Sequence, residues 1–249
     1  MKRIIYILSV FLFVAACDKT DNTVAPMGTS DGNTGQGGSL ARFTIANDHL
    51  YVVDNKKLYT YSLANSATPV LTNNQQISTD IETIYAYQDK LFIGSQEAMY
   101  IYSISDASHP VREGQASHVR ACDPVVAKDK YAYVTVRSGT SCGGTISALM
   151  VYDITYISNP SLKKTINLEG PYGLGIKDNR LYVCNGSNGL NVYDISIPTN
   201  PQLVKKIQGD TFYDVIPTND VLICMVQGGT VLYNYNPADE LVKAAKISN

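Results

Sequence analysis

The chain has 249 residues, of which 20 are Lys or Arg and 22 are Asp or Glu, so its formal net charge is −2. This mildly acidic balance argues against nucleic acid as a partner and against a polybasic attachment to lipid headgroups, because both need an excess of basic residues. Tryptophan is absent, which removes one side chain well suited to stacking on sugar rings.

The first sixteen residues have the pattern of a secretory signal peptide. Lys2 and Arg3 precede an apolar run, residues 4–16, that is too short to span a bilayer comfortably. The run ends in VAAC, which resembles the lipobox of bacterial lipoproteins, whose cysteine is lipidated and becomes the new N-terminus. We therefore expect removal of residues 1–16 and acylation, including palmitate, of Cys17. The alternative is an ordinary secretory signal that happens to contain a cysteine.

Residues 17–38 are expected to form the lipidated cysteine and a flexible tether. The segment after Cys17, DKTDNTVAPMGTSDGNTGQGG, has few bulky apolar residues, so it cannot bury enough surface to offset its ordering entropy. A coil of this length spans on the order of 25 Å, which would let the globular part stand off the membrane. The expected location is the cell envelope, anchored by lipid to the outer membrane, on its periplasmic face or at the cell surface.

Residues 39–249 contain five copies of a strand-rich unit. One strand of each unit follows a turn with Asp or Asn, residues that bond the local backbone and tolerate left-handed conformations. These strands are anchored, at spacings of 41, 40, 50 and 41 residues, by Leu50, Leu91, Tyr131, Leu181 and Leu222. Further on, each unit has a landmark tyrosine: Tyr61, Tyr102, Tyr152, Tyr193 and Tyr233. A proline follows eight residues after the first four of these: Pro69, Pro110, Pro160 and Pro201.

Four short strands in about 41 residues, repeated five times, predict an all-β fold, a β-propeller of about five four-stranded blades. Each blade has two apolar faces and must pack against neighbours, which a ring of blades allows. A β-sandwich is the competing fold, but it gives no reason for a regular repeat. The expected blades are residues 39–78, 79–117, 118–168, 169–208 and 209–249.

Several segments of these repeats are similar to a known family. They are ACDPVV (121–126), YAYVTVRSG (131–139), YGLGIKDNRLYVCNGSNGLNVYDIS (172–196) and YDVIP (213–217). They look like the LVIVD-repeat lipoproteins of Bacteroidetes-type bacteria, and the resemblance covers essentially all of residues 39–249 as well as the signal. It implies a β-propeller-like, extracytoplasmic protein and does not imply an activity, because most members have no assigned function. The fifth repeat departs from the pattern, with Leu241 in the proline position.

One spacing is long because of an insertion that contains Cys142. The Tyr131–Tyr152 separation is 21 residues, where the other repeats have 11 or 12. The extra residues include SGTSCGG (138–144) and lie between the second and third strands of blade 3, at the same end of the blade as Cys122. In a secreted protein this favours a Cys122–Cys142 disulfide, which would stabilise the fold by roughly 3 kcal/mol. Free thiols, a metal site and a catalytic cysteine remain alternatives, whereas a phosphate loop would require a lysine that the segment lacks.

The other cysteines and two of the histidines suggest structural roles. Cys184 and Cys224 each fall within the second strand of a blade, where a thiol serves as a small buried hydrophobe. His49 lies in a turn and His109 precedes a proline. His118 is the histidine that we regard as worth testing.

The connections between blades and the loops between second and third strands should lie at one end of the propeller, which we call the mouth face. Propellers commonly bind ligands there, by analogy of fold. The alternative is that these side chains only cap strands and solvate loops. The candidate binding residues are Asp80, Glu82, His118, Arg120, Asp123, Glu169, Tyr172, Asp210, Tyr213 and Asp214.

We assign no catalytic residue, metal ligand or cofactor. Zinc sites need several closely spaced ligands, and glycosidases need a carboxylate pair, and neither can be identified from spacing. The expected function is therefore a non-catalytic binding or scaffold module that contacts a protein or glycan while lipid holds it at the membrane. The alternative is an extracytoplasmic hydrolase or lyase acting on polysaccharide. We favour the first because only one loop is lengthened.

Overall fold

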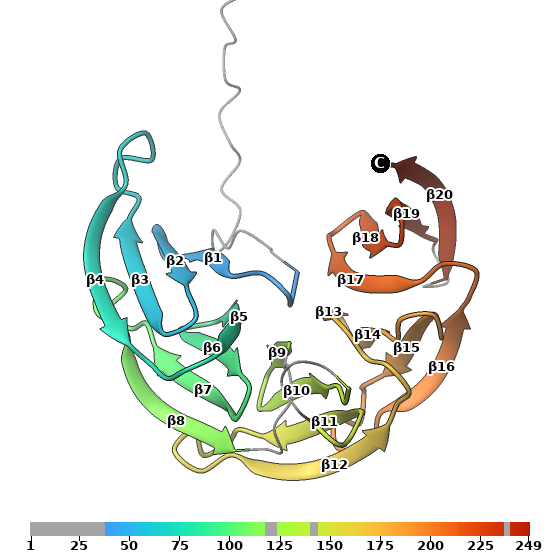
Figure 1. Cartoon of the computed structure of the whole chain (residues 1–249), viewed down its shortest axis with the longest axis horizontal. Helices are drawn as coiled ribbons and strands as arrows, with labels where there is room; N and C mark the ends of the chain where they lie inside the picture. The colour runs from blue at the N-terminus through green and yellow to red at the C-terminus, as the bar shows by residue number, and fades with distance from the viewer. Residues whose placement is uncertain (1–37, 118–123, 140–143, 237–239) are drawn as a thin grey trace, which may run out of the picture. The chain divides into compact units, whose positions relative to one another are not determined.

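The structure is a computed structural model that describes residues 38–117, 124–139, 144–236 and 240–249. These residues form five separate four-stranded antiparallel sheets, each with its strands in chain order. The prediction of an all-β propeller with about five blades is confirmed, and Figure 1 shows the first strand of each sheet nearest the centre and the fourth outermost. The described residues include no helix with the length and apolar character needed to cross a membrane.

The first three blades follow one another from blue to yellow in Figure 1. Blade 1 comprises β1 (Phe43–Ala46), β2 (His49–Val53), β3 (Lys57–Ser62) and β4 (Val70–Gln76). Blade 2 comprises β5 (Ile81–Tyr87), β6 (Lys90–Ser95), β7 (Ala98–Ser103) and β8 (Val111–Ser117). Blade 3 comprises β9 (Val125–Lys128), β10 (Tyr131–Val136), β11 (Ala148–Asp153) and β12 (Ser161–Asn167). The lengthened loop lies where the spacing predicts, between β10 and β11.

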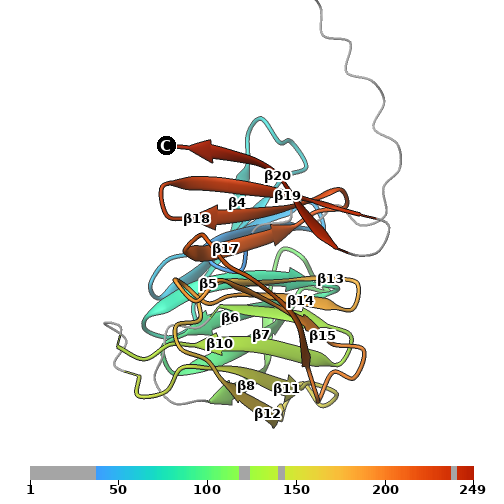
Figure 2. The ribbon, with the colours of Figure 1, turned by 90° about the vertical axis from the view of Figure 1, so that its right-hand side faces the viewer.

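The last two blades are seen from the side in Figure 2. Blade 4 comprises β13 (Leu174–Lys177), β14 (Arg180–Cys184), β15 (Leu190–Asp194) and β16 (Gln202–Ile207). Blade 5 comprises β17 (Phe212–Pro217), β18 (Val221–Val226), β19 (Gly229–Tyr235) and β20 (Leu241–Ser248). Each blade therefore takes all four of its strands from one continuous stretch of chain.

Short polar turns join the first and second strands of the blades, as the sequence predicts. Asn47 and Asp48, between β1 and β2, have φ angles of 50° and 54°, the left-handed conformation of a two-residue hairpin turn. Gln88, Asp129 and Asp178 adopt similar angles at the corresponding place in blades 2, 3 and 4. Asn and Asp tolerate this conformation better than most residues, which explains their recurrence before each second strand.

The landmark tyrosines mark a β-bulge that recurs in every blade. In blade 1, Thr60 pairs with Asn73 but Tyr61 pairs with Leu71, so Thr72 is an extra residue on the outermost strand. The same shift between the third and fourth strands occurs immediately before Tyr102, Tyr152, Tyr193 and Tyr233. A bulge bends and twists the strand that carries it, so every blade turns its outer strand at the same point.

The pairing also corrects one anchor of the sequence repeat. In blade 1, Leu50 pairs with the landmark Tyr61, and Leu181 pairs with Tyr193 in blade 4. In blade 3 the partner of Tyr152 is Ala132, not Tyr131 as the sequence pattern suggested. The register places the small Ala132 in the buried position and leaves Tyr131 half-buried.

The apolar core consists of four clusters, each between two consecutive blades. One cluster joins blades 1 and 2, and the others join blades 2 and 3, 3 and 4, and 4 and 5. The last of these includes Cys184 and Cys224, both free thiols with no exposed surface. Burial raises the pKa of Cys224 to about 12 and that of Cys184 well above its ordinary value, so both thiols are unreactive. Their prediction as small buried hydrophobes is confirmed.

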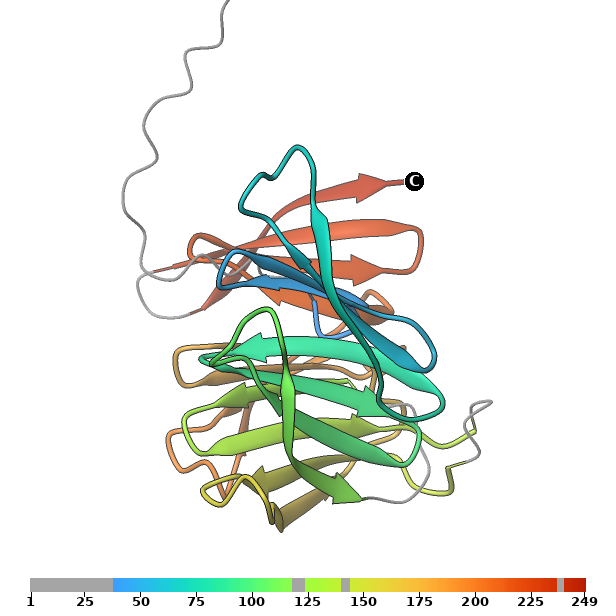
Figure 3. The ribbon, with the colours of Figure 1, turned by 90° about the vertical axis from the view of Figure 1, so that its left-hand side faces the viewer.

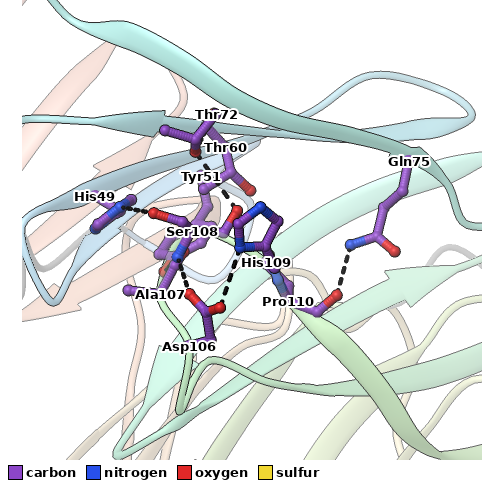
Figure 4. Close-up of polar contacts among 10 residues, drawn as sticks. All are labelled: His49, Tyr51, Thr60, Thr72, Gln75, Asp106, Ala107, Ser108, His109 and Pro110. Atoms are coloured by element: carbon purple, nitrogen blue, oxygen red, sulfur yellow. Dashed lines mark hydrogen bonds and ion pairs between the residues drawn. The ribbon is translucent and has the colours of Figure 1, made fainter.

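Polar contacts support the packing of blade 1 on blade 2 (Figure 4). His49 contacts Ser108 at 2.9 Å through Nε2, and the Tyr51 hydroxyl donates to the Ala107 carbonyl at 2.7 Å. His109 contacts the Asp106 carboxylate in the same loop at 3.0 Å. Both histidines therefore stabilise structure, as expected, although His49 begins β2 and is not a turn residue.

Residues 38–40 connect the start of blade 1 to blades 4 and 5 through the buried Asp214. The Leu174 amide donates to Ser39 Oγ at 2.7 Å, and the Ser39 hydroxyl donates to Asp214 at 3.3 Å. The Leu40 and Val215 amides also bond the Asp214 carboxylate. A side chain at Gly38 or Gly173 would collide with that carboxylate. We call this group of contacts the latch.

The latch should make stability depend on pH in an unusual direction. Burial raises the pKa of Asp214 from 3.8 to about 6, although its hydrogen bonds oppose this. The folded state then binds the proton more tightly than the unfolded state, so the contribution of Asp214 to stability is fully present below pH 4 and is lost as pH rises through 6, by about 3 kcal/mol. Asp214→Asn should remove this slope in urea unfolding followed between pH 4 and 7.

Asp210→Asn is the matched control. Lys246 and Lys243 hold the pKa of Asp210 below its ordinary value, so this group contributes stability at neutral pH that is lost on acidification. Its variant should therefore change the profile in the opposite direction. Identical slopes in the wild type and Asp214→Asn would contradict the role given to the latch.

Candidate ligand-binding site at the mouth face

The structure describes seven of the ten candidate residues. His118, Arg120 and Asp123 lie outside the described residues, as do the three cysteines expected to be modified, Cys17, Cys122 and Cys142. The geometry of the mouth face is therefore built from the remaining seven candidates and from their described neighbours.

A pocket of about 260 Å³ opens on the mouth face at blades 3, 4 and 5. Three predicted residues line it: Glu169 and Tyr172 from the connection into blade 4, and Tyr213 from the first strand of blade 5. The loop between β14 and β15 contributes Asn185 and Asn188. The expectation that connections and second-to-third-strand loops meet at one end is thus met in this part of the molecule.

Three side chains that line the pocket contact one another, and we call them the stack. The Arg137 guanidinium carbon lies 3.8 Å from the centre of the Tyr172 ring, a distance at which a cation is attracted to the ring face. The Tyr213 ring meets the Tyr172 ring edge-on, with ring centres 5.2 Å apart. Because each of the three residues comes from a different blade, the stack joins blades 3, 4 and 5 at the pocket.

Backbone hydrogen bonds fix Tyr172 in this position. Its amide donates to the Cys184 carbonyl at 2.8 Å, and its carbonyl accepts the Thr135 hydroxyl at 2.6 Å. The neighbouring Gly173 amide donates to the Tyr213 carbonyl at 2.9 Å. Blades 3, 4 and 5 thus all hold the backbone around Tyr172, so the ring is placed before any ligand arrives.

The loop beside Tyr172 requires a glycine. Gly186 has a φ of 56°, and a β-carbon there would lie 3.1 Å from the Tyr172 ring. The adjacent Asn185 is buried, and its side-chain carbonyl accepts the Gly170 amide at 2.9 Å. The loop therefore holds the side-chain amides of Asn185 and Asn188 at the pocket, and glycine allows this conformation at little cost.

Glu82 brings a carboxylate near Arg137 but does not line the pocket. Burial raises its pKa, while the Gln96 hydrogen bond and the positive charges of Arg42 and Arg137 oppose that rise. Asp80 lies in the turn before β5, with a φ of 58° and its carbonyl bonded by the Gln96 amide. We interpret Asp80 as a turn residue and Glu82 as part of the electrostatic surroundings of Arg137.

Asp210 and Asp214 do not line the pocket, although they are next in sequence to Thr211 and Tyr213, which do. Asp210 is paired with Lys246 at 2.7 Å and Lys243 at 3.0 Å, both on the outermost strand of blade 5. Asp214 is only 4% exposed and belongs to the latch. Their carboxylates are thus occupied by other parts of the protein.

Sequence reasoning missed the central cation, Arg137. It directly precedes the SGTSCGG insertion, at the end of the chain segment YAYVTVRSG. The search for site residues followed the connections between blades and ignored the loops after second strands, although both were expected at one end. Applying that rule to the residue after each second strand would have found Arg137 and Asn185.

The chemistry of the pocket is that of polar recognition. A guanidinium group, amide groups and tyrosines surround it, and of the described residues that line it only Glu169 carries a carboxyl group. Across the described part of the chain, no cluster of three or more His, Cys, Asp or Glu side chains is placed to hold a metal ion. Two other cavities, of about 340 and 170 Å³, lie between outer strands of adjacent blades, away from this stack.

Known proteins are similar to this chain mainly in fold. A functionally unknown protein from Desulfotomaculum acetoxidans has 10% identity and a TM-score of 0.70, over 86% of this chain and 71% of that one. A protein from Lactobacillus plantarum has 18% identity and a TM-score of 0.63, over 80% and 67%. BamB from Moraxella catarrhalis has 6% identity and a TM-score of 0.56, over 76% and 56%. No curated protein shows a significant sequence match.

The sequence match to a family is confined to one blade. Residues 173–208 match the LVIVD repeat, and they contain all four strands of blade 4, including the loop beside Tyr172. The other four blades repeat its turn, bulge and strand order. The chain is therefore a repeat β-propeller that carries an LVIVD repeat at residues 173–208.

Proposed function

We propose that the protein is a non-catalytic binding module that holds a polar group of a glycan or protein in the mouth pocket. The observation that carries this proposal is the Arg137–Tyr172–Tyr213 stack, because it places a cation and two hydroxyl-bearing rings from three blades around one opening. A volume of about 260 Å³ suits a single sugar ring or side chain better than a long polymer segment.

The alternative, a hydrolase or lyase acting on polysaccharide, has less support from the pocket. Glycosidases generally place two carboxyl groups on either side of the bond to be cleaved. Glu169 is exposed and is the single carboxylate among the described lining residues, while Glu82 and Asp214 are half-buried and buried elsewhere. Preformed hydrogen-bonding groups without an acid–base pair favour binding over turnover.

The central test is binding of the mature, full-length protein to two probes. These are an array of envelope polysaccharides and envelope membranes from cells that lack the protein. We expect Arg137→Gln and Tyr172→Ala each to lower affinity at least about tenfold, equivalent to about 1.4 kcal/mol, because each removes one of the three side chains of the stack. Surface plasmon resonance would measure the change.

Arg112→Gln provides the matched control. Arg112 also lies over a tyrosine ring, 4.8 Å from the centre of Tyr100, but it is on the outer strand of blade 2 and not at the pocket. Equal losses in Arg112→Gln and Arg137→Gln would place the binding site elsewhere. Release of glycan fragments that is lost in Glu169→Gln would favour the hydrolase instead.

We also propose that the module acts in the cell envelope, anchored to the outer membrane by lipid on Cys17. The support is the lipobox-like end of the leader, followed by a polar tether. Cells grown with an alkyne analogue of palmitate should label the wild-type protein, and Cys17→Ala should abolish the label. Cys184→Ala is the control, since that thiol is buried. Label that persists in Cys17→Ala would exclude this anchor.

A disulfide between Cys122 and Cys142 is the third part of the proposal. Alkylation of the native protein at pH 8, followed by peptide mapping without reduction, should recover these two cysteines in one linked peptide. Cys184 and Cys224 serve as internal standards, because their buried thiols should react only after unfolding in urea. Alkylated Cys122 and Cys142 in the native sample would contradict the disulfide.

A further inference from the structure

Five blades should share five interfaces if the ring were filled, but the described residues form only four interblade cores. No apolar cluster joins blade 5 to blade 1. The inner strands of consecutive blades pack together in the pairs β1 and β5, β5 and β9, β9 and β13, and β13 and β17, and no comparable contact joins β17 to β1. We call the boundary between blade 5 (red) and blade 1 (blue) the seam (Figures 1 and 3).

Blade 1 turns an uncovered apolar face toward the seam. Its anchor Leu50 is half-buried, whereas Leu91, Leu181 and Leu222, its equivalents in blades 2, 4 and 5, have no exposed surface. Likewise, Tyr61 is the one landmark tyrosine that is not fully buried among the five. The cross-strand pairs put these residues on one face of the sheet, which we call the blade 1 wall: Phe43, Ile45, Leu50, Val52, Tyr59 and Tyr61.

Blade 5 also has a face that no other blade covers, the face on which a following blade would pack. Ile223 occupies the position that Tyr51, Phe92, Tyr133 and Tyr182 occupy in blades 1 to 4. Those four are at most 2% exposed because the next blade covers them, whereas Ile223 is half-buried and Met225 beside it is 51% exposed. By register the blade 5 wall consists of Ile216, Ile223, Met225, Thr230 and Leu232, and Asp214 of the latch, the partner of Met225, lies on the same face on the innermost strand.

The two walls are thus equivalent to the faces that meet at the four existing interfaces. The blade 1 wall is the kind of face that a preceding blade covers, and the blade 5 wall is the kind that a following blade covers. The latch holds the chain across the inner end of the seam, but no wall residue belongs to any of the four cores. Of the eleven wall residues, two are exposed and nine are half-buried, and contiguous apolar surface that is left partly exposed commonly marks an interaction site.

The area is sufficient for a specific interface. Strands about 4.8 Å apart and about six residues long give a four-stranded sheet about 400 Å² per face. A sheet inserted between the walls would cover both of them and bury both of its own faces, about 1,600 Å² in all, the size of a stable protein–protein interface. Two structurally similar chains are longer, since this chain spans 71% and 67% of them.

We propose that the seam is a docking site for a β-sheet of a partner polypeptide, which inserts as an additional blade. The partner sheet must be antiparallel, about four short strands wide and apolar on both faces. A second copy of this chain does not meet this requirement, because each of its terminal blades already has one face covered by its own neighbour.

A blade of known sequence is the probe for this site. A second copy of residues 169–207 would be fused directly after Asn249, so that its connection matches the native one between blades 3 and 4. If the seam accepts a blade, the melting temperature of the mature protein should rise by about 5 °C or more. The rise should disappear in a fusion whose extra blade carries serine at the positions copied from Leu181, Tyr182, Val183 and Val192.

Two wall variants locate the effect. Leu50→Asp and Ile223→Asp should each abolish the rise, whereas Val111→Asp should not, because Val111 is exposed on the outer strand of blade 2, away from the seam. No rise in the fused wild type, or a rise that survives both wall variants, would overturn the proposal. Dimerisation of the unfused protein that Ile223→Asp abolishes would also overturn it, because the seam would then serve self-association.

Discussion

The structure depends on one constraint: a blade of this repeat is apolar on both faces and therefore cannot bury its surface alone. All four cores lie between blades, and none lies within one. Neighbouring blades consequently fix one another's side chains, and this also holds for the side chains that line the mouth pocket. Tyr172 belongs to blade 4, yet its ring and backbone are placed by Arg137 and Thr135 of blade 3 and by Tyr213 of blade 5. The site is a product of blade packing more than of any single loop.

Much of the fold follows from the sequence because every repeat carries the same turn residues and the same landmark tyrosine. Polar turns gave the first hairpin of each blade, and each landmark tyrosine coincides with the bulge before the outer strand. The site was harder to predict because it depends on distances between side chains of different blades. The repeat spacing along the chain gives no information about these distances. Tyr172 and Tyr213 were found as polar or aromatic residues at connections. Arg137 was missed because its role arises from the ring it covers, and Asp214 was misplaced because its burial depends on residues 38–40.

The pocket and the seam divide two kinds of chemistry between two regions. At the pocket, a guanidinium, amides and phenol groups surround an opening suited to a polar ligand, and hydrogen bonds hold the Tyr172 backbone and the Asn185 side chain. At the seam, aliphatic and aromatic side chains lie on flat sheet faces and are suited to a sheet. Because the pocket involves blades 3 to 5 and the seam involves blades 5 and 1, blade 5 takes part in both. A sheet bound at the seam would contact blade 5, the same sheet that carries Tyr213.

The latch also has a consequence for the order of folding. The Ser39–Asp214 hydrogen bond joins residues 175 positions apart, whereas the contacts between successive blades span far shorter separations, such as 56 for Tyr51 to Ala107 and 37 for Thr135 to Tyr172. Contacts between nearby parts of a chain form sooner than distant ones. As synthesis proceeds from the N-terminus, blades can pack one after another, but Ser39 must wait for almost the entire chain. A contact of very long range in the chain thus involves the first described residues.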